Sequence, residues 1–148
     1  MFRGSSHLTL DNKGRLIVPA RHRDALLERC GGHLVITADL DPCLLVYPQP
    51  EWEIVQQKLD TLSNFDRRVR ALQRRLTGHA VDTEMDSAGR VLVSPELREY
   101  AHLDKDVVLV GQGKKFELWN RDHWKSLAEE PSGLTPESLP PQLEGFSL

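Results

Sequence analysis

The sequence is poor in cysteine, and it lacks the residue patterns that most enzymes and metal sites require. Its 148 residues include two cysteines, Cys30 and Cys43. Two thiols are too few to build a zinc site unaided, so we expect both to be reduced and buried, as in a cytosolic protein. The six histidines show no metal-binding pair spacing, and neither a nucleophile elbow nor a Gly-rich phosphate loop occurs. We therefore expect no enzymatic activity, metal, cofactor or small-molecule ligand.

Long apolar runs are missing as well. No run approaches the roughly 20 residues of a membrane span, and residues 1–20 lack the apolar core of a signal peptide. These absences predict a cytoplasmic protein without a membrane partner. The apolar content of 39% and the charged content of 28% are ordinary for a globular chain, which at this length forms one domain or two very small ones.

A general excess of positive charge is also absent, since the formal net charge is −3. This value argues against a broadly basic coat for nucleic acid. The acidic residues are unevenly distributed, because residues 126–148 contain four glutamates and no lysine or arginine. The remaining 18 acidic residues stand against 19 basic ones in 1–125, a net charge of +1. The tail also contains four prolines, so we expect little fixed structure in it.

The most informative stretch of the sequence occurs twice. Both copies read apolar-Asp-x-x-Gly-Arg, then three apolar residues, then a proline and a segment with a further arginine, at residues 10–23 and 85–98. Asp at this position caps its own turn and Gly takes the positive φ that the turn needs, so the flanking apolar residues are expected to form the two strands of a hairpin. Turn chemistry does not explain the arginines that follow the glycines, Arg15 and Arg90.

The repeat extends well beyond the two turns. Tyr47 and Trp52 stand 72 positions before Trp119 and Trp124, and the turns themselves are 75 positions apart. This near-constant offset indicates an internal duplication. We predict a first unit at 1–62, a bridging Arg-rich helix at 63–78, a second unit at 79–127 and an acidic, Pro-rich tail at 128–148.

Neither predicted unit is large enough for a good core of its own, and short strands leave unpaired edges. Two units that interleave their hairpins would solve both problems. The predicted fold is therefore mainly β with helices (α+β), a pseudo-twofold β-barrel of two tandem ββαββ-like units flanked by helices.

The bridging helix has two contrasting faces. Its apolar stripe is Phe65, Val69, Leu72 and Leu76, and its outer face holds Arg67, Arg68, Arg70, Arg74 and Arg75. That outer face is either simply solvated or a contact with an acidic surface, DNA or a neighbouring subunit. The chain also has more large aromatics than one thin barrel readily buries, which favours an oligomer over complete burial within one chain: Trp52, Phe65, Tyr100, Phe116, Trp119 and Trp124.

The repeated motif resembles the SpoVT-AbrB swapped-hairpin DNA-binding domain, and two such units in one chain resemble the MraZ family, bacterial regulators of the division and cell wall gene cluster. Further matching segments lie at 43–48, 51–52, 97–101 and 115–119, and the resemblance covers residues 1–127. It implies a regulator, expected to be a repressor, that binds direct repeats of duplex DNA in its own promoter. It also implies a ring-shaped homo-oligomer in the cytoplasm, associated with the nucleoid.

The family's Asp-x-x-x-Arg motif falls on Asp11 with Arg15 and on Asp86 with Arg90. We expect eight residues to contact DNA or to order the contacting loops: Asp11, Lys13, Arg15, Arg21, Arg23, Asp86, Arg90 and Arg98. The planar fork of arginine matches the O6 and N7 acceptors of guanine, and lysine holds phosphates. One departure is that single-copy AbrB-type domains have a basic residue where this chain has Leu8 and Thr83.

The two copies differ in charge. Residues 11–24 hold four basic and two acidic side chains, net +2, whereas residues 86–99 hold two basic and three acidic ones, net −1. We therefore assign base readout to Arg15, phosphate contact to Lys13, and mainly the holding of its own turn to Arg90. The alternative function is a non-catalytic assembly or antitoxin-like protein-interaction module.

Overall fold

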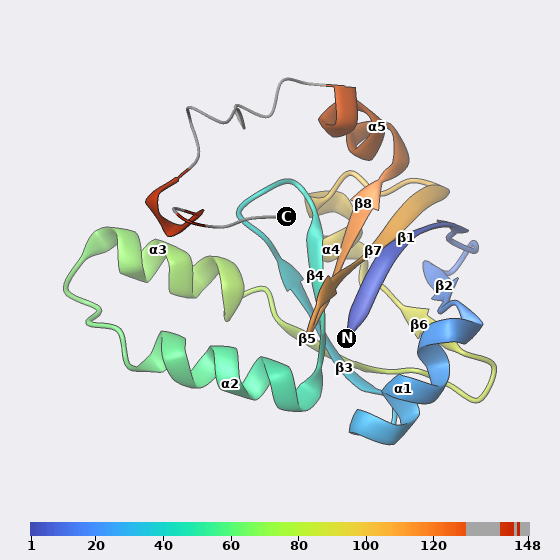
Figure 1. The fold of residues 1–148 in the computed structure, drawn as a ribbon, viewed down its shortest axis with the longest axis horizontal. Helices are drawn as coiled ribbons and strands as arrows, with labels where there is room; N and C mark the ends of the chain where they lie inside the picture. Colours follow the sequence, from blue (N-terminus) through green and yellow to red (C-terminus); the bar gives the residue numbers. More distant parts are fainter. Residues whose placement is uncertain (130–139, 144, 146–148) are drawn as a thin grey trace.

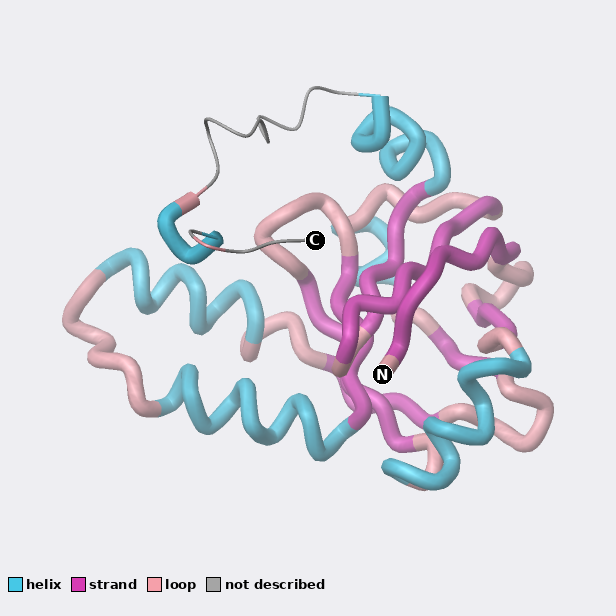
Figure 2. The backbone as a smooth tube through the Cα atoms, viewed as in Figure 1, coloured by secondary structure: helices cyan, strands magenta, loops and turns pink. Residues whose placement is uncertain are grey.

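The computed structural model describes residues 1–129, 140–143 and 145, and within them the chain is a mixed α+β protein (Figures 1 and 2). The elements follow the order β1 (Phe2–Thr9), β2 (Arg15–Ile17), α1 (Ala20–Cys30), β3 (His33–Ala38), β4 (Leu44–Pro48), α2 (Gln49–Asp60), α3 (Arg67–Leu76), β5 (Val81–Glu84), β6 (Arg90–Leu92), α4 (Pro95–Tyr100), β7 (Asp106–Gly113), β8 (Phe116–Asn120), α5 (Arg121–Glu129) and the 3-10 helix η1 (Pro141–Leu143). The expectation of an unstructured tail falls largely on residues outside the described ranges.

The strands of the two units are exchanged. Six strands form an antiparallel sheet in the order β1-β7-β8-β4-β3-β5, and β2 pairs with β6 in a separate two-stranded ladder. The first strand of each unit therefore pairs with the third strand of the other unit, and the order reads the same from both edges. The predicted α+β class and the pseudo-twofold interleaving of two units are confirmed.

The expected local hairpins are wrong in one respect. The Asp11 amide donates to the Arg15 carbonyl at 2.9 Å, which closes the turn, but β1 and β2 then diverge. β1 pairs along its length with β7, and Leu16 of β2 lies opposite Val91 of β6. Alternating apolar residues mark a strand with one buried face, but they do not say which strand it pairs with. The partner strand of β2 belongs to the other copy of the motif.

The helices that carry the predicted arginines begin at prolines. Pro19 caps α1 and Pro95 is the first residue of α4, positions where the missing N–H of proline has no helical partner to lose. Ser94 adds a side-chain cap by accepting from the Leu97 amide. At the other end of α1, Gly31 takes a left-handed conformation with φ 60° and closes the helix.

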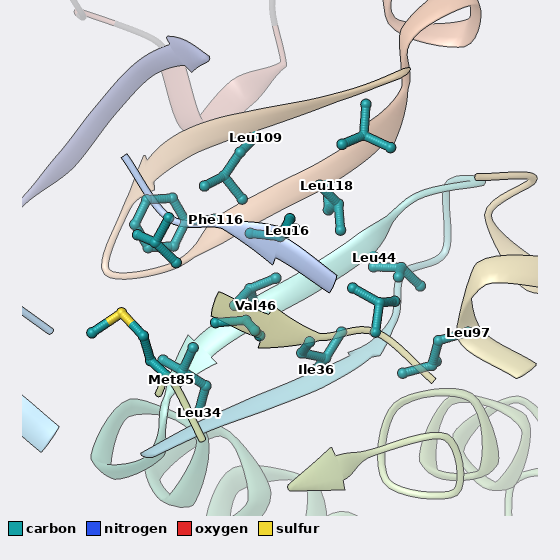
Figure 3. Close-up of a cluster of buried hydrophobic side chains, with 14 of the residues drawn as sticks. Leu16, Leu34, Ile36, Leu44, Val46, Met85, Leu97, Leu109, Phe116 and Leu118 are labelled. Atoms are coloured by element: carbon teal, nitrogen blue, oxygen red, sulfur yellow. The ribbon is translucent and has the colours of Figure 1, made fainter. Parts of the chain in front are cut away.

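One hydrophobic core is shared equally by the two units. Of its 18 buried side chains, nine come from residues 2–46 and nine from residues 85–118. Figure 3 shows Leu16 and Val46 of the first unit facing Leu109, Phe116 and Leu118 of the second. Since burial of each such side chain contributes about 1.5–3 kcal/mol, separation of the units would remove much of the stabilisation of both.

The other face of the sheet is covered by helices. Trp52 of α2 packs in one cluster with Tyr47 of β4 and Leu76 of α3, and Trp119 forms another with Cys43 and the half-buried Trp124 of α5. Cys43 is fully buried, as expected, but Cys30 is only partly buried at the end of α1, where its thiol donates to the Leu26 carbonyl. Among the described helices, none has the length and apolar character needed to cross a bilayer.

The bridging segment forms α3, as predicted, but its apolar stripe is shorter than expected. Val69, Leu72 and Leu76 are half-buried, whereas Phe65 is 94% exposed because it precedes the Asp66 cap and lies outside the helix. The other five aromatics that suggested an oligomer are buried or half-buried within the chain. These five side chains therefore need no second subunit to be removed from solvent.

The strand exchange predicts how the chain responds to division. A fragment of residues 1–78 carries β1 and β2 but lacks their partners β7 and β6. We expect this fragment, and the matching fragment 79–148, either to be unfolded or to form a homodimer in which two copies exchange strands, and to regain native structure when mixed. Circular dichroism with sedimentation of each fragment tests this. A folded monomer of either fragment would contradict it.

Candidate nucleic-acid interface

The two Asp-x-x-Gly-Arg turns have the same geometry. In the first, Asp11 Oδ1 accepts hydrogen bonds from the backbone amides of Lys13 and Arg15, both at 2.9 Å, and Oδ2 accepts from Arg15 Nε at 2.8 Å. In the second, Asp86 accepts from the Ala88 amide at 2.9 Å and from Arg90 through its amide and Nε, both at 2.8 Å. Each carboxylate therefore orders its loop and also fixes the stem of its arginine.

These hydrogen bonds change the acidity of both carboxyl groups. The backbone hydrogen bond from Arg15 is the main cause that lowers the pKa of Asp11 from 3.8 to about 2, with the Arg15 side chain and the Lys13 amide adding to it. The pKa of Asp86 is lowered for the same reasons, chiefly by the backbone hydrogen bond from Arg90. Both groups are anions at neutral pH, which keeps the two guanidinium groups paired and oriented.

The turn glycines meet arginines of the other unit. Gly14 and Gly89 have φ of 83° and 81°, in the left-handed region that favours glycine. A Cβ on Gly14 would lie 2.6 Å from the guanidinium of Arg98, and one on Gly89 would lie 2.6 Å from Nε of Arg23. Glycine therefore suits each of these positions for two reasons: the turn requires a positive φ, and an arginine side chain approaches closely.

Arg23 and Arg98 are also tied to backbone near the ladder. Arg23 Nε donates to the Val18 carbonyl at 2.7 Å, and Arg98 Nε donates to the Val93 carbonyl at 3.0 Å. The same two valines extend the β2–β6 pairing, since the Val18 amide donates to the Gly89 carbonyl at 2.8 Å and the Val93 amide to the Gly14 carbonyl at 2.9 Å. Each arginine thus joins the strand end of its own unit to the turn of the other.

The structure regroups the eight residues predicted from the sequence. Lys13, Asp11 and Arg15 share their end of the ladder with Arg98, whereas Asp86 and Arg90 share theirs with Arg23. The sequence had grouped Arg23 with the first motif and Arg98 with the second, because each lies close to that motif in the chain. A local pattern does not show that strands are exchanged between the units.

Arg21 lies apart from both turns. It is exposed on α1, where its Nη2 donates to Ser6 Oγ of β1 at 2.7 Å and its Nε donates to Nε2 of the buried His22 at 3.2 Å. This contact holds α1 against β1. It does not bring Arg21 into the hydrogen-bonded groups at either end of the ladder.

The ladder presents two residues that the sequence-based assignment missed. Leu16 and Val91 point inward, so Arg15, Ile17, Arg90 and Leu92 all lie on the outer face. Ile17 and Leu92 are 52% and 48% exposed. The two-residue period of a strand would have identified them, because it places Ile17 on the face of Arg15 and Leu92 on the face of Arg90.

One cluster elsewhere has the composition of a metal site. Ligand atoms of Asp39, Cys43 and Glu117 lie within 4.8 Å of one another on the helix-covered face of the sheet. Burial, together with the nearby Asp39 and Glu117 carboxylates, strongly raises the pKa of the Cys43 thiol, so the thiolate that binds metals is disfavoured. Glu117 already accepts from Trp119 Nε1 at 3.1 Å. These contacts describe a hydrogen-bonded group, and they do not by themselves indicate a metal.

Comparison of the sequence with known proteins shows which family the chain belongs to. A family profile described as "MraZ protein, putative antitoxin-like" matches the chain twice, over residues 1–75 and 76–136. A protein of Nitrosospira multiformis named transcriptional regulator MraZ is 55% identical over 148 residues, with both chains covered completely. The chain belongs to the MraZ family.

Other MraZ relatives align over almost the whole chain. The transcriptional regulator MraZ of Thioalkalivibrio sulfidiphilus is 55% identical over 150 aligned positions, with both chains covered completely. That of Pseudomonas aeruginosa (strain LESB58) is 51% identical and covers 93% of this chain and 96% of its own. The two profile matches meet at the end of α3, so each contains one copy of the turn, and both copies belong to the MraZ pattern.

Arg98 packs on the first turn and Arg23 on the second, an arrangement that we call crossed because each arginine belongs to the other unit. We predict that each one stabilises the turn on which it packs. Arg98→Ala should disturb the amide signals of residues 12–15 in the first turn, and Arg23→Ala those of residues 87–90 in the second. Each should lower the free energy of unfolding by about 1.5–3 kcal/mol, the usual contribution of a hydrogen bond from a charged donor. Two-dimensional NMR with thermal unfolding measures both effects.

Arg21→Ala is the matched control, since Arg21 is on α1 near Arg23 but contacts neither turn. It should leave the amide signals of both turns in place. If Arg98→Ala perturbed only the second turn, or Arg23→Ala only the first, the crossed arrangement would be wrong.

The lowered pKa values of the turn aspartates predict an acid sensitivity. The ionised form is favoured in the folded chain, so its stabilising contribution is complete above pH about 4 and is lost as the pH falls towards the folded pKa of about 2 for Asp11. Asp11→Asn should reduce stability at pH 7 and flatten its decline between these values. Urea unfolding over this pH range, with the exposed Asp24→Asn as control, tests the prediction. Parallel curves for Asp11→Asn and the unmodified chain would refute it.

Proposed function

We propose that this protein is a DNA-binding transcription regulator that recognises its operator through the β2–β6 ladder and the two turns at its ends. One observation carries the proposal: two Asp–Arg turns of matched geometry border a single exposed two-stranded ribbon. The names of the relatives, all transcriptional regulators, support it. In this role the chain binds duplex DNA and catalyses no reaction.

The dimensions and chemistry of the ribbon suit the major groove. B-DNA admits a two-stranded β-ribbon there, and the groove edges carry the acceptor pairs that arginine recognises. Arg15 and Arg90 hold their carboxylates through Nε, which leaves the terminal Nη groups as donors to bases. Lys13 at the first tip supplies a phosphate contact, and Asp11 and Asp86 preset the loops before binding.

Binding of this kind is weak for one ladder and strong for several. A homo-oligomer, in ring form as the family resemblance implies, would present repeated ladders and raise the effective concentration of each, with a gain of roughly 10²–10⁴ in avidity. We therefore propose direct repeats as the operator, repression of the chain's own gene cluster as the effect, and the nucleoid in the cytoplasm as the location.

The two copies are proposed to be unequal. Lys13 in the first turn is replaced by Ala88 in the second, and Arg21 corresponds to Glu96, which would repel phosphates. The turn geometry itself offers no basis for the difference, since Arg15 and Arg90 make the same contacts with their aspartates. The inequality therefore rests on the charge around each turn and not on how its arginine is held.

The matched turns allow a well-controlled test. Arg15→Ala and Arg90→Ala each remove the same intramolecular ion pair, so a difference between them in DNA affinity reports contact with DNA. We expect Arg15→Ala to cost about 1–3 kcal/mol per engaged site and to relax the base preference, and Arg90→Ala to cost clearly less. Lys13→Ala should reduce the slope of log affinity against log salt by about 1.

Affinities are measured by gel shift and fluorescence anisotropy on the chain's own upstream region, at one salt concentration, after circular dichroism confirms folding. Equal losses, or a larger loss for Arg90→Ala, would contradict the inequality. No binding of the unmodified chain to that region would contradict the proposed function. That result would favour the second candidate, an antitoxin-like protein-interaction module, to which the family description points.

A further inference from the structure

The outer face of the β2–β6 ladder holds two aliphatic side chains whose role the proposed function leaves open. Ile17 lies directly opposite Arg90, and Leu92 directly opposite Arg15. Both aliphatic side chains are about half exposed, whereas their neighbours Leu16 and Val91 are almost completely buried. Each rung of this face therefore consists of one guanidinium and one aliphatic group, related by the pseudo-twofold.

Core packing does not account for these two residues. A strand with one solvated face normally alternates apolar and polar residues, and the outer position is the polar one. Here the inner positions already fill the core, so threonine or lysine at the outer positions would satisfy the fold. Both copies of the motif nevertheless have a branched aliphatic residue there, even though their turns differ in charge.

The charge around the two aliphatic residues indicates what covers them. The two turns and the arginines packed on them carry five cationic side chains against two carboxylates: Lys13, Arg15, Arg23, Arg90 and Arg98 against Asp11 and Asp86. Asp104 and Lys105 also lie beside the first turn, and their charges cancel. A surface of this net charge fits a polyanion better than the same surface of a second copy. Ile17 and Leu92 thus lie where the proposed duplex would sit. Their strands, β2 and β6, are at the opposite end of the long axis from α2 and α3 (Figure 1).

Resting on the proposed function, we infer that Ile17 and Leu92 read thymine, by packing against its 5-methyl group near the base contacted by Arg15, which lies opposite Leu92 and two residues from Ile17 on the same face. Thymine is the base that offers an apolar group in the major groove. The two rungs are two residues apart along the strand, roughly 6.6 Å, which matches about two base-pair steps of 3.4 Å. The inferred operator therefore has a guanine and a thymine within about two steps of each other.

A change of one methyl group on the DNA tests this inference. Each thymine of the bound upstream region is replaced in turn by deoxyuridine, which removes the methyl group and keeps every hydrogen-bonding atom. The unmodified protein should lose about fourfold in affinity at a contacted thymine, the value expected for one buried methyl. Fluorescence anisotropy at a fixed salt concentration gives the dissociation constants.

The protein side of the test uses Ile17→Ala and Leu92→Ala, both at half-exposed positions. Each should bind the unmodified DNA several-fold more weakly and should be insensitive to deoxyuridine at the thymine that it reads. Ile54→Ala is the matched control, because Ile54 is a 46% exposed aliphatic residue on α2, away from the ladder. It should retain both the affinity and the deoxyuridine effect of the unmodified chain.

The outcomes separate this inference from the proposed function. If Arg15→Ala weakens binding but deoxyuridine has no effect at any thymine, DNA binding stands and methyl readout is wrong. Methyl readout is also wrong if Ile17→Ala and Leu92→Ala keep the full deoxyuridine effect, or if they instead dissociate an oligomer in sedimentation. If the unmodified chain does not bind the duplex at all, both the function and the inference are wrong.

Discussion

The pairing of β2 with β6 is the constraint on which the rest of the structure depends. It is only three residues long on each side, with Leu16 opposite Val91 at its centre. Its inner side chains close the core that both units share, and its outer side chains form the candidate interface. A ladder this short gains little from its own hydrogen bonds. The ladder is stabilised by the buried side chains of Leu16 and Val91. It is also stabilised by Arg98 at one end and Arg23 at the other, each of which connects a strand end of its own unit to the turn of the other unit.

Those arginines make the candidate interface a joint product of both units. The side chains of Arg23 and Arg98 extend from helices α1 and α4. Each donates a hydrogen bond to a backbone carbonyl of its own unit and packs on the turn glycine of the other unit. The turns are thereby held from within by an aspartate and from outside by an arginine. Groups ordered before binding lose less conformational entropy when they meet a ligand, so this double support suits a surface for recognition.

Much of this arrangement follows from local sequence, and the exceptions have two different causes. The Asp11 and Asp86 turns were predicted because they depend on neighbours in the chain, and the duplication was predicted because the motif recurs at a near-constant offset. The hairpin pairing of β1 with β2 was wrong, and Ile17 and Leu92 were missed. The hairpin was wrong because the strands of each turn motif pair with strands of the other copy, whereas Ile17 and Leu92 could have been found from the two-residue period of their own strands.

The sequence alone determined the presence of two equivalent units, the conformation of their turns and the membership of the aspartates and first arginines in one motif. These properties need only short-range chemistry, namely a carboxylate near three donors and a glycine at positive φ. The tertiary structure alone decided which turn each of Arg23 and Arg98 supports and which side chains lie opposite one another across the ladder. Those properties depend on pairing between strands that lie far apart in the chain. A two-residue hydrophobic period does not specify which strand is the partner.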